Sequence, residues 1–482
     1  MSSLWNEDIE NDDPAVNNIL WRNSTMKKTD LLVIGGSAGG ILSATTARKA
    51  YGDIDITLIR DTEKVMVPCG IPYIYGTLHD TNKNVIPDAG LIEANVNVII
   101  DRVVKIDKDA KVVTTESNET IEYKKLIVAT GSLPIIPTFI PGHDLDNVFS
   151  VLKRQEYLNH VLEKVQAAEN VTVIGGGFIG VEFAEQIRLL GKNVTLVELA
   201  DACLWQAFDK AFTDEIENLL KDSGIRVLTK TKVKKIIGEK TVEAIELDSG
   251  EIVPADLVIL GLGVKPNAAL AAEAGLNVTD RGAVVVDQYT RTSDPNIFAV
   301  GDCAEKKCFF THKDVPVLLA STAAMEAKIA GCNAFHLRLV RANKGTISAF
   351  STKIAGCTFA AAGITEARAL QEGFSIMTGE FTTMDRHPGS LPGAQKTNIK
   401  LMFSKCSGII LGAQISGGDT VAEMINILSL AIQKGITATE LNTFQVATHP
   451  LISASPIAYP INAAAMNAIA STCRYLNEGL EI

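Results

Sequence analysis

The segment Val171-Thr-Val-Ile-Gly-Gly-Gly-Phe-Ile-Gly180 decides the fold of this 482-residue chain. An apolar strand runs into a turn in which Gly175, Gly177 and Gly180 keep the G-x-G-x-x-G spacing. The helix-like residues 183–190 follow it. Backbone N–H groups at such a helix N-terminus can approach a pyrophosphate, so the segment predicts a Rossmann-type dinucleotide site.

Glu198 ends the next predicted strand, residues 193–198. At this distance a carboxylate accepts hydrogen bonds from the hydroxyls of an adenosine ribose. No Arg or Lys follows closely, so the position favours NADH over NADPH, whose 2′-phosphate would face the carboxylate. An unrelated strand-glycine-helix turn is the alternative.

A second, less regular turn lies about 140 residues earlier, in Asp30-Leu-Leu-Val-Ile-Gly-Gly-Ser-Ala-Gly-Gly40. Gly35 and Gly40 hold the outer positions, but Ser37 replaces the middle glycine. Arg60 ends the following strand, where an acid is expected. Two later segments support the turn, because doubly wound sheets bind ligands at strand ends: Leu126-Ile-Val-Ala-Thr-Gly131 and Ile297-Phe-Ala-Val-Gly-Asp302.

With these motifs the chain resembles the pyridine nucleotide-disulfide oxidoreductases, flavoproteins that include glutathione reductase, coenzyme A-disulfide reductase, NADH oxidase and NADH peroxidase. The resemblance covers about residues 29–470. It implies an α/β fold with two Rossmann-like nucleotide-binding domains, for FAD and NAD, and a C-terminal α+β dimerisation domain. The predicted divisions are an N-terminal extension (1–28), the FAD domain (29–150 and 276–345), the NAD domain (151–275) and the dimerisation domain (346–482). Within the last, residues 354–360 and 408–412 are expected to form strands and residues 421–433 a helix.

The resemblance also implies the cofactor sites. Asp302 is expected to bind the ribitol chain of FAD, and Val103 to contact adenine through its backbone. The expected FAD residues are Gly35, Gly36, Ser37, Ala38, Gly39, Gly40, Arg60, Pro68, Val103, Ala129, Thr130, Gly131, Gly301, Asp302, Leu319, Ala320 and Ser321. Glu182 matches a family glutamate near the nicotinamide, and the expected NAD residues are Gly175, Gly177, Phe178, Ile179, Gly180, Glu182, Glu198 and Gly263.

Cys69, in Met66-Val-Pro-Cys69-Gly-Ile-Pro-Tyr-Ile-Tyr-Gly76, is the predicted redox centre. Pro72 suits the first turn of a helix, so we expect Cys69 at a helix N-terminus, where the dipole would lower its pKa. A dithiol enzyme of the family needs a second cysteine five positions away, but Lys64 and Ile74 occupy those positions. Cys69 is therefore expected to pair with a substrate sulfur or to cycle through sulfenic acid. A buried packing cysteine is the alternative.

His449 is the second catalytic candidate. Thr448-His-Pro450 resembles the C-terminal His-Pro of glutathione reductase, where a histidine from the partner subunit acts as acid and base. Ala454 replaces the glutamate that follows in the family, so the group that orients the imidazole is open. A histidine satisfied in the core is the alternative.

Several residues bear on the substrate. NADH oxidases and peroxidases carry a histidine in the first glycine turn, where this chain has Ser37, so oxygen and peroxide are disfavoured as substrates. The tyrosines typical of coenzyme A-disulfide reductases are missing before Pro392-Gly393 and near Pro450. Arg48 and Lys49, with Lys27 and Lys28, could bind a nucleotide-bearing thiol such as coenzyme A or could be solvated charges. A Cys303–Cys308 disulfide is a further, disfavoured possibility.

Together these features predict an NADH-dependent FAD enzyme that reduces a small disulfide, persulfide or polysulfide through Cys69. The alternatives are an NADH oxidase or peroxidase acting through a cysteine sulfenate, and an electron-transfer reductase for a rubredoxin-like protein.

The composition limits the partners and the setting. A net charge of −11 without a sustained basic run argues against nucleic acid. Eight scattered cysteines and an N-terminus without an apolar signal fit the cytoplasm, and the seven histidines form no metal-ligand spacing. Residues 441–473 carry no formal charge, but their prolines oppose a membrane helix. We expect this segment to be buried in a homodimer, over the partner's active site.

Overall fold

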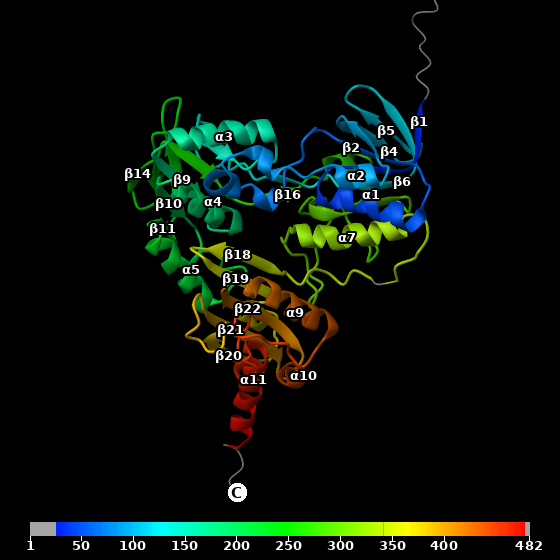
Figure 1. Cartoon of the computed structure of the whole chain (residues 1–482). Coiled ribbons are helices and arrows are strands. Elements are labelled where there is room, and N and C mark those ends of the chain that lie inside the picture. Colours follow the sequence, from blue (N-terminus) through cyan, green and yellow to red (C-terminus); the bar gives the residue numbers. More distant parts are fainter. Residues whose placement is uncertain (1–25, 341, 478–482) are drawn as a thin grey trace, which may run out of the picture.

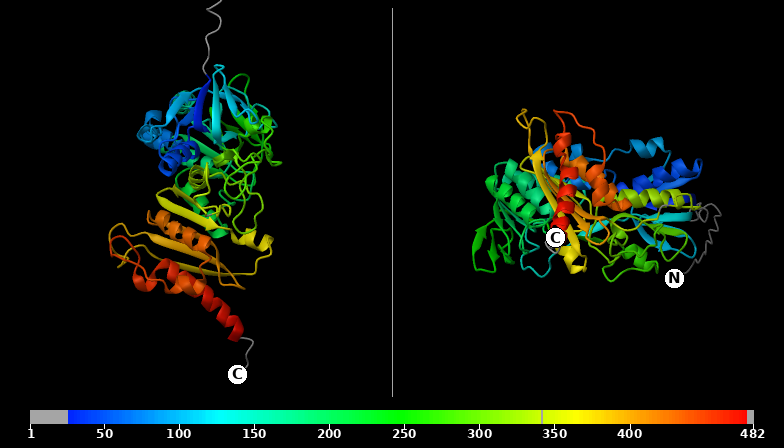
Figure 2. Two further views of the ribbon diagram at one scale, coloured as in Figure 1. Left: turned by 90° about the vertical axis from the view of Figure 1, so that its right-hand side faces the viewer. Right: turned by 90° about the horizontal axis from the view of Figure 1, so that it is seen from below.

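The computed structural model describes residues 26–340 and 342–477, with side chains given up to residue 471. Two α/β lobes lie side by side above a third lobe that carries the C-terminal helix (Figure 1). The turned views show the third lobe below the other two, with the C-terminal helix pointing away from them (Figure 2). Most of the predicted N-terminal extension, residues 1–25, lies outside the described residues.

The first lobe is built on a sheet with the order β3-β2-β1-β6-β5-β4, in which β17 also pairs with β6. Leu31, Leu32 and Val33 of β1 have no exposed surface, as expected for the centre of a parallel sheet covered on both faces. Helices α1 and α7 pack against each other on one side. The elements are β1 (Lys27–Ile34), α1 (Ala38–Tyr51), β2 (Ile56–Arg60), α2 (Ala89–Glu93), β3 (Asn97–Ile100), β4 (Val103–Asp107), β5 (Val112–Thr115), β6 (Thr120–Val128), α6 (Ala269–Glu273), β17 (Ile297–Ala299) and α7 (Ala320–Asn333).

The second lobe repeats this design with the parallel sheet order β11-β10-β9-β15-β8. A small antiparallel sheet, β12-β13-β14, covers part of it, and the pair β7–β16 connects the two lobes. The elements are β7 (Ser132–Pro134), β8 (Val148–Ser150), α3 (Gln155–Ala167), β9 (Asn170–Ile174), α4 (Phe178–Leu189), β10 (Asn193–Val197), α5 (Lys210–Asp222), β11 (Arg226–Leu228), β12 (Val233–Ile237), β13 (Ala244–Leu247), β14 (Ile252–Pro254), β15 (Leu257–Leu260) and β16 (Val264–Pro266).

The third lobe is an antiparallel sheet, β18-β19-β22-β21-β20, with helices on it. The α/β fold with two Rossmann-like sheets and a C-terminal α+β unit is therefore confirmed. The elements are β18 (Phe350–Ile354), β19 (Cys357–Gly363), α8 (Glu366–Gln371), β20 (Ile376–Met384), β21 (Lys396–Ser404), β22 (Ile410–Gly417), α9 (Val421–Lys434), α10 (Ala438–Thr443) and α11 (Pro460–Asn477).

Two local predictions in the third lobe need correction. The apolar run from Ile354 was predicted as one strand, but Ala355 and Gly356 have φ values of 49° and 81° and form the tight turn between β18 and β19. The predicted strand at 408–412 begins only at Ile410, because Gly408 has a φ of 71°. Both errors arise because positive-φ turns interrupt an apolar pattern that looks continuous in the sequence.

Residues 441–473 divide into two parts. Ile461, Ala464, Ala465 and Ala468 of α11 are buried against the sheet, whereas Ile457 is 95% exposed in the loop before it. The loop is thus exposed in the single chain, and the burial expected for it in a homodimer stays a prediction. Within residues 26–340 and 342–477, no helix has both the length and the apolar composition that crossing a bilayer requires.

Candidate active site

The two glycine turns have the same construction. Gly35 N–H donates to Ile59 O over 2.8 Å, and Gly175 N–H donates to Val197 O over 2.8 Å. A Cβ on Gly40 would lie 1.8 Å from the carbonyl oxygen of Gly35, and the equivalent Gly180 shows the same distance in the second turn. Each strand can therefore turn into its helix only with glycine at both ends of the turn. The first-turn N–H groups of both helices point to the same edge of each sheet, where a pyrophosphate fits.

The middle position explains why a serine is tolerated in the first turn. A Cβ added to Gly177 meets no atom within 4 Å, so the fold itself does not require glycine there. Ser37 caps α1 with φ −94° and ψ −166°, an extended conformation that any residue adopts. Ser37 therefore leaves the shape of the turn unchanged.

The residues at the ends of β2 and β10 differ between the two lobes. Glu198 accepts hydrogen bonds from the N–H groups of Gly176 (2.5 Å) and Ala200 (2.6 Å). Its counterpart Arg60 is 5% exposed and donates to both carboxylate oxygens of Asp88 over 2.6 Å. The Arg60 guanidinium lowers the pKa of Asp88 through this pair. Asp88 thus holds the Arg60 guanidinium within the fold, while the aliphatic part of Arg60 borders Gly36 of the glycine turn, and its contact with FAD stays a prediction.

The other residues predicted for FAD lie along the edge of the first sheet. Ala129, Thr130 and Gly131 follow β6, and the hydroxyl of Thr130 donates to Asn267 O over 2.5 Å. Asp302 lies in a short 3-10 turn, Gly301–Cys303, after β17, and accepts a 2.7 Å hydrogen bond from Ser132 Oγ. The remaining members are Val103 at the start of β4, Pro68 before Cys69, and Leu319, Ala320 and Ser321 at the N-terminus of α7.

The residues predicted for NAD gather at the N-terminus of α4. Phe178, the first residue of that helix, stacks on Phe350 of β18 with ring centroids 4.9 Å apart and planes inclined by 16°. Ile179 and Gly180 complete the first turn of the helix, and Gly263, with φ 86°, precedes β16. An aromatic contact with the third lobe therefore lies directly beside the second glycine turn.

Cys69 lies in the 3-10 turn Pro68–Gly70, followed by a π-helix, Ile74–Leu78, that packs on α4. Tyr75 is fully buried beneath it. A Cβ on Gly70 would lie 1.9 Å from Asn84 Oδ1, so the chain after the cysteine passes close to a neighbouring segment. The thiol itself is exposed, which excludes the buried packing role in this chain.

The expectation of a lowered pKa at Cys69 is wrong for the protein alone. Neighbouring atoms limit its solvation and raise the thiol pKa, and the negative charges of Glu182 and Asp302 raise it further. Lys153 opposes this effect. The short 3-10 turn offers no long helix whose dipole would favour a thiolate.

Glu182 is the most strongly perturbed carboxyl group near Cys69. Burial raises its pKa to about 7, although a 2.8 Å hydrogen bond from Thr352 Oγ1 in the third lobe lowers it in part. Burial, and next the charge of Glu182, also raise the pKa of Tyr73. A carboxyl that titrates near neutral pH thus lies between the Cys69 segment and β18.

Replacing Glu182 with glutamine should change the pH dependence of stability. The folded carboxyl stays protonated up to about pH 7, whereas the ordinary pKa of a glutamate is 4.5, so ionisation destabilises the folded state as pH rises through this window. In the wild type this carboxyl lowers the free energy of unfolding by at most about 1.4 kcal/mol per pH unit across that window. The variant should lack this pH-dependent loss of stability. Chemical denaturation should therefore show that the free energy of unfolding of the variant, relative to the wild type, is higher at pH 8 than at pH 5. An equal change with pH in both proteins would contradict the raised pKa.

His449 lies on the exposed loop between α10 and α11 of the third lobe, the two helices shown at the bottom of Figure 1. Its Nδ1 accepts a 3.3 Å hydrogen bond from Leu451 N–H, and its own N–H donates to Ser453 Oγ over 2.9 Å. The loop backbone therefore orients the imidazole. The exposure of His449 excludes a histidine satisfied in the core of the chain.

Several site residues carry no sequence signal. Lys153 Nζ lies 3.1 Å from Ser132 Oγ and 3.7 Å from Asp302 Oδ2, so it supports the carboxylate expected to bind ribitol. Thr352 reaches Glu182 from a strand 170 residues away in the sequence. Such contacts depend on how the lobes pack, which no local spacing encodes.

Other candidates have structural roles. Arg48 donates hydrogen bonds to the carbonyl oxygens of Gly52, Ile54, Ala94 and Asn95, so its guanidinium stabilises the fold. Lys27 and Lys28 belong to β1 and pair with Glu119 and Glu122. Cys303 and Cys308 are both free, and Cys303 donates to Val300 O. Cys303 and Cys308 thus form no disulfide in this structure, and the binding of coenzyme A by the lysines stays a prediction.

Comparison with known proteins relates most of the chain to one family. The family model for pyridine nucleotide-disulphide oxidoreductases matches residues 29–327, and the model for their dimerisation domain matches residues 350–457. The chain is 32% identical over 452 residues to an NADH oxidase of Methanocaldococcus jannaschii, covering 91% of this chain and 98% of the relative. It is 31% identical over 425 residues to the NAD(P)H coenzyme A polysulfide/persulfide reductase of Pyrococcus horikoshii, covering 86% and 93% of the two chains. The structure of a NAD-dependent persulfide reductase from A. fulgidus superposes with a TM-score of 0.84 at 32% identity, covering 92% of this chain and 84% of that one.

Proposed function

Because the chain belongs to the pyridine nucleotide-disulphide oxidoreductase family and is an FAD- and NADH-dependent oxidoreductase, we propose that it reduces a small persulfide, polysulfide or disulfide at Cys69. The observation that carries this proposal is the exposed thiol of Cys69 in the turn before Ile71, packed against α4 and without a cysteine at the dithiol spacing. A thiol with no neighbouring partner can form its disulfide only with a sulfur that arrives from outside the chain.

The chain's own residues fit the two cofactors. The glycine turn at Gly35, the segment 129–131 and Asp302 would hold FAD, and the turn at Gly175 with Glu198 would hold NADH. Gly40 and Gly180 lie close to the carbonyl oxygens of Gly35 and Gly175, and these tight turns form the concave backbone surface that would hold each pyrophosphate. When bound, the flavin supplies two-electron transfer between the nicotinamide and the thiol.

Cys69 then carries out the reduction of the sulfur substrate. Its thiolate attacks one sulfur of the substrate, an S–S bond forms at Cys69, and the substrate S–S bond breaks to release a thiolate. We assign both proton transfers to His449 of the partner subunit. Its imidazole takes the proton of the Cys69 thiol, and the resulting imidazolium gives that proton to the released thiolate. The two electrons that regenerate the Cys69 thiol come from NADH.

We further propose that the active unit is a homodimer. The matched dimerisation domain and the exposed apolar loop residues Leu451, Ile452 and Ile457 support this assembly. Covering them in a dimer would bring His449 to a second subunit. The free thiols of Cys203, Cys303 and Cys308 support a cytoplasmic setting.

A comparison of electron acceptors tests the function directly. NADH oxidation by the purified flavoprotein is measured with coenzyme A disulfide, polysulfide, glutathione disulfide, peroxide and oxygen. We expect kcat/KM for one of the sulfur acceptors to exceed that for oxygen or peroxide by at least about 10²-fold. A preference for oxygen or peroxide, with a Cys69 sulfenate trapped by a dimedone probe, would support the oxidase function instead.

The coenzyme preference gives a second test. We expect NADH to be preferred to NADPH, because the Glu198 carboxylate would repel a 2′-phosphate. Glu198→Ala should lower the ratio of kcat/KM for NADH to kcat/KM for NADPH by about 10-fold or more. Glu217→Ala, at an acid on α5, is the control. Equal kcat/KM values for NADH and NADPH in the wild type would contradict the assignment of Glu198.

A further inference from the structure

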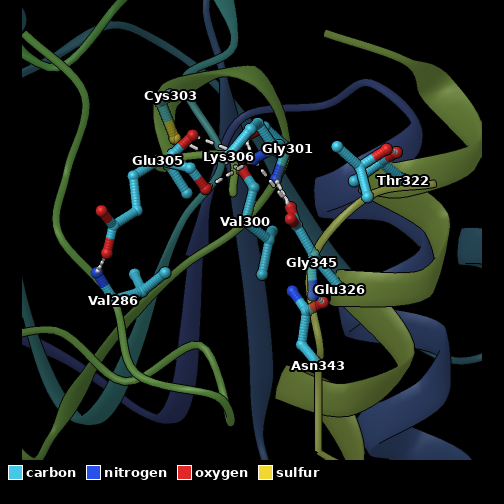
Figure 3. A network of polar contacts seen from close by, with 12 residues as sticks. Val286, Val300, Gly301, Cys303, Glu305, Lys306, Thr322, Glu326, Asn343 and Gly345 are labelled. Atoms are coloured by element: carbon cyan, nitrogen blue, oxygen red, sulfur yellow. Dashed lines mark hydrogen bonds and ion pairs between the residues drawn. The ribbon is translucent and has the colours of Figure 1, made fainter. Parts of the chain in front are cut away.

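A buried ion pair lies beneath the turn that carries Asp302. Lys306 Nζ is 3.1 Å from Glu326 Oε2, and their side chains are only 3% and 2% exposed. Figure 3 shows both side chains converging on the Gly301 turn. Neither residue belongs to the glycine turns or to the sulfur chemistry described above.

The pair holds both peptide groups of one residue. Lys306 Nζ donates to Gly301 O over 2.7 Å, and Glu326 Oε2 accepts from Gly301 N–H over 2.8 Å. Lys306 also donates to Ala304 O over 2.9 Å, closing the turn from its other end. Gly301 has a φ of 73°, a conformation that needs glycine and an external constraint to define it.

The same pair joins two segments that are separate in the sequence. Asp302 follows Gly301 directly, so any rotation of the Gly301 peptide moves its carboxylate relative to Ser132. Glu326 lies on α7, six residues after the helix begins at Ala320. One buried contact thus fixes Asp302 relative to the N-terminus of α7, and the proposed function places both at the flavin.

Stability alone gives a weak reason for such a pair. Removing two charges from water costs several kcal/mol per ion, and apolar replacements of a whole buried pair are often neutral or stabilising. A buried charged pair differs from an apolar contact in that its hydrogen bonds are directional and fix the conformation of the backbone groups that they reach. The backbone contacts to Gly301 N–H and O are the geometry that this pair fixes.

We propose that Lys306 and Glu326 are positioning residues for FAD, which lock the Gly301–Asp302 turn to α7 so that the ribitol-binding carboxylate and the helix N-terminus reach the cofactor together. The proposal rests on the proposed function only in placing FAD at Asp302. It predicts that the pair controls how tightly FAD is held, beyond any effect on folding.

The test measures FAD release from the holoenzyme. Lys306→Met, Glu326→Gln and the double variant are diluted, and the recovery of free flavin fluorescence gives the dissociation rate constant. We expect the single variants to release FAD at least about 30-fold faster, because each leaves an unpaired buried charge, and the double variant about 10-fold faster. The visible circular dichroism of the bound flavin should also change. Where a single variant is insoluble, the double variant carries the test, since it leaves no charge unpaired.

The neighbouring Lys307 provides the matched control. Its side chain is 44% exposed and pairs with Asp314 at the surface and with the buried Glu305, which keeps its hydrogen bond from Val286 N–H. Lys307→Met should therefore change FAD release less than about 2-fold. A double variant that melts at a lower temperature but releases FAD at the wild-type rate would overturn the proposal and leave a purely structural pair. A wild-type protein that holds no FAD would instead contradict the proposed function.

Discussion

Cys69→Ser is expected to reduce turnover of the sulfur acceptor by at least about 10³-fold, because a serine hydroxyl cannot form the mixed disulfide. FAD should remain bound, since none of its proposed holding groups is changed. Reduction of the flavin by NADH in the stopped-flow instrument should proceed at the wild-type rate, and NADH-driven reduction of artificial dyes should survive.

Cys406→Ser provides the matched control for this experiment. Cys406 is also exposed, but it lies in the turn between β21 and β22, away from the two glycine turns. This variant should keep full activity with every acceptor. Full turnover of the sulfur acceptor by Cys69→Ser would instead favour an electron-transfer reductase that needs no thiol.

His449→Ala is expected to slow the sulfur half-reaction by about 10²–10⁴-fold with little effect on flavin reduction by NADH, because both of its proton transfers belong to the sulfur half-reaction. Rapid-mixing measurements of the two half-reactions separate these steps. His312→Asn is the control, since His312 is a loop histidine with φ 55°, a conformation that asparagine tolerates. Equal loss in both half-reactions would indicate damage to the fold.

Hybrid dimers test whether His449 acts across the subunits. When Cys69→Ser and His449→Ala chains are combined in one dimer, one of its two sites keeps the native cysteine and the native histidine if the partner supplies the imidazole. The hybrid should then recover about half of the wild-type activity, as expected for independent sites. If both groups come from one chain, the hybrid stays inactive.

The parts of the fold that the sequence predicted are those with local signals. The spacing of Gly175, Gly177 and Gly180 predicts a strand, a turn and a helix because the atoms involved lie within a few residues of each other. The helix expected at residues 421–433 is observed as α9 for the same reason. The hairpin turn at Ala355 was missed because its two positive φ values leave little trace in an apolar run.

The site was predicted less completely, for reasons of distance and solvation. Cys69 was found from its flanking prolines and glycine, but its raised pKa depends first on burial and then on the charge of Glu182, which lies on α4 of another lobe. Arg60 was assigned to FAD from its position in the strand, and only the structure reveals that Asp88 holds it in the interior. Thr352 and Lys306 act through contacts that form after the lobes pack, so no pattern in the chain indicates them.

The glycines of the second turn are subject to two different constraints, as the empty space next to Gly177 shows. The outer glycines are required by the polypeptide itself, since a Cβ on any of them would overlap a backbone carbonyl oxygen, either of the same turn or of the neighbouring segment. The middle glycine meets no such obstacle, so only a bound molecule can demand it. The first lobe has already exchanged that position for Ser37 and kept its architecture. Ancestral or engineered forms of this chain could therefore alter ligand choice at the middle position while inheriting the turn unchanged.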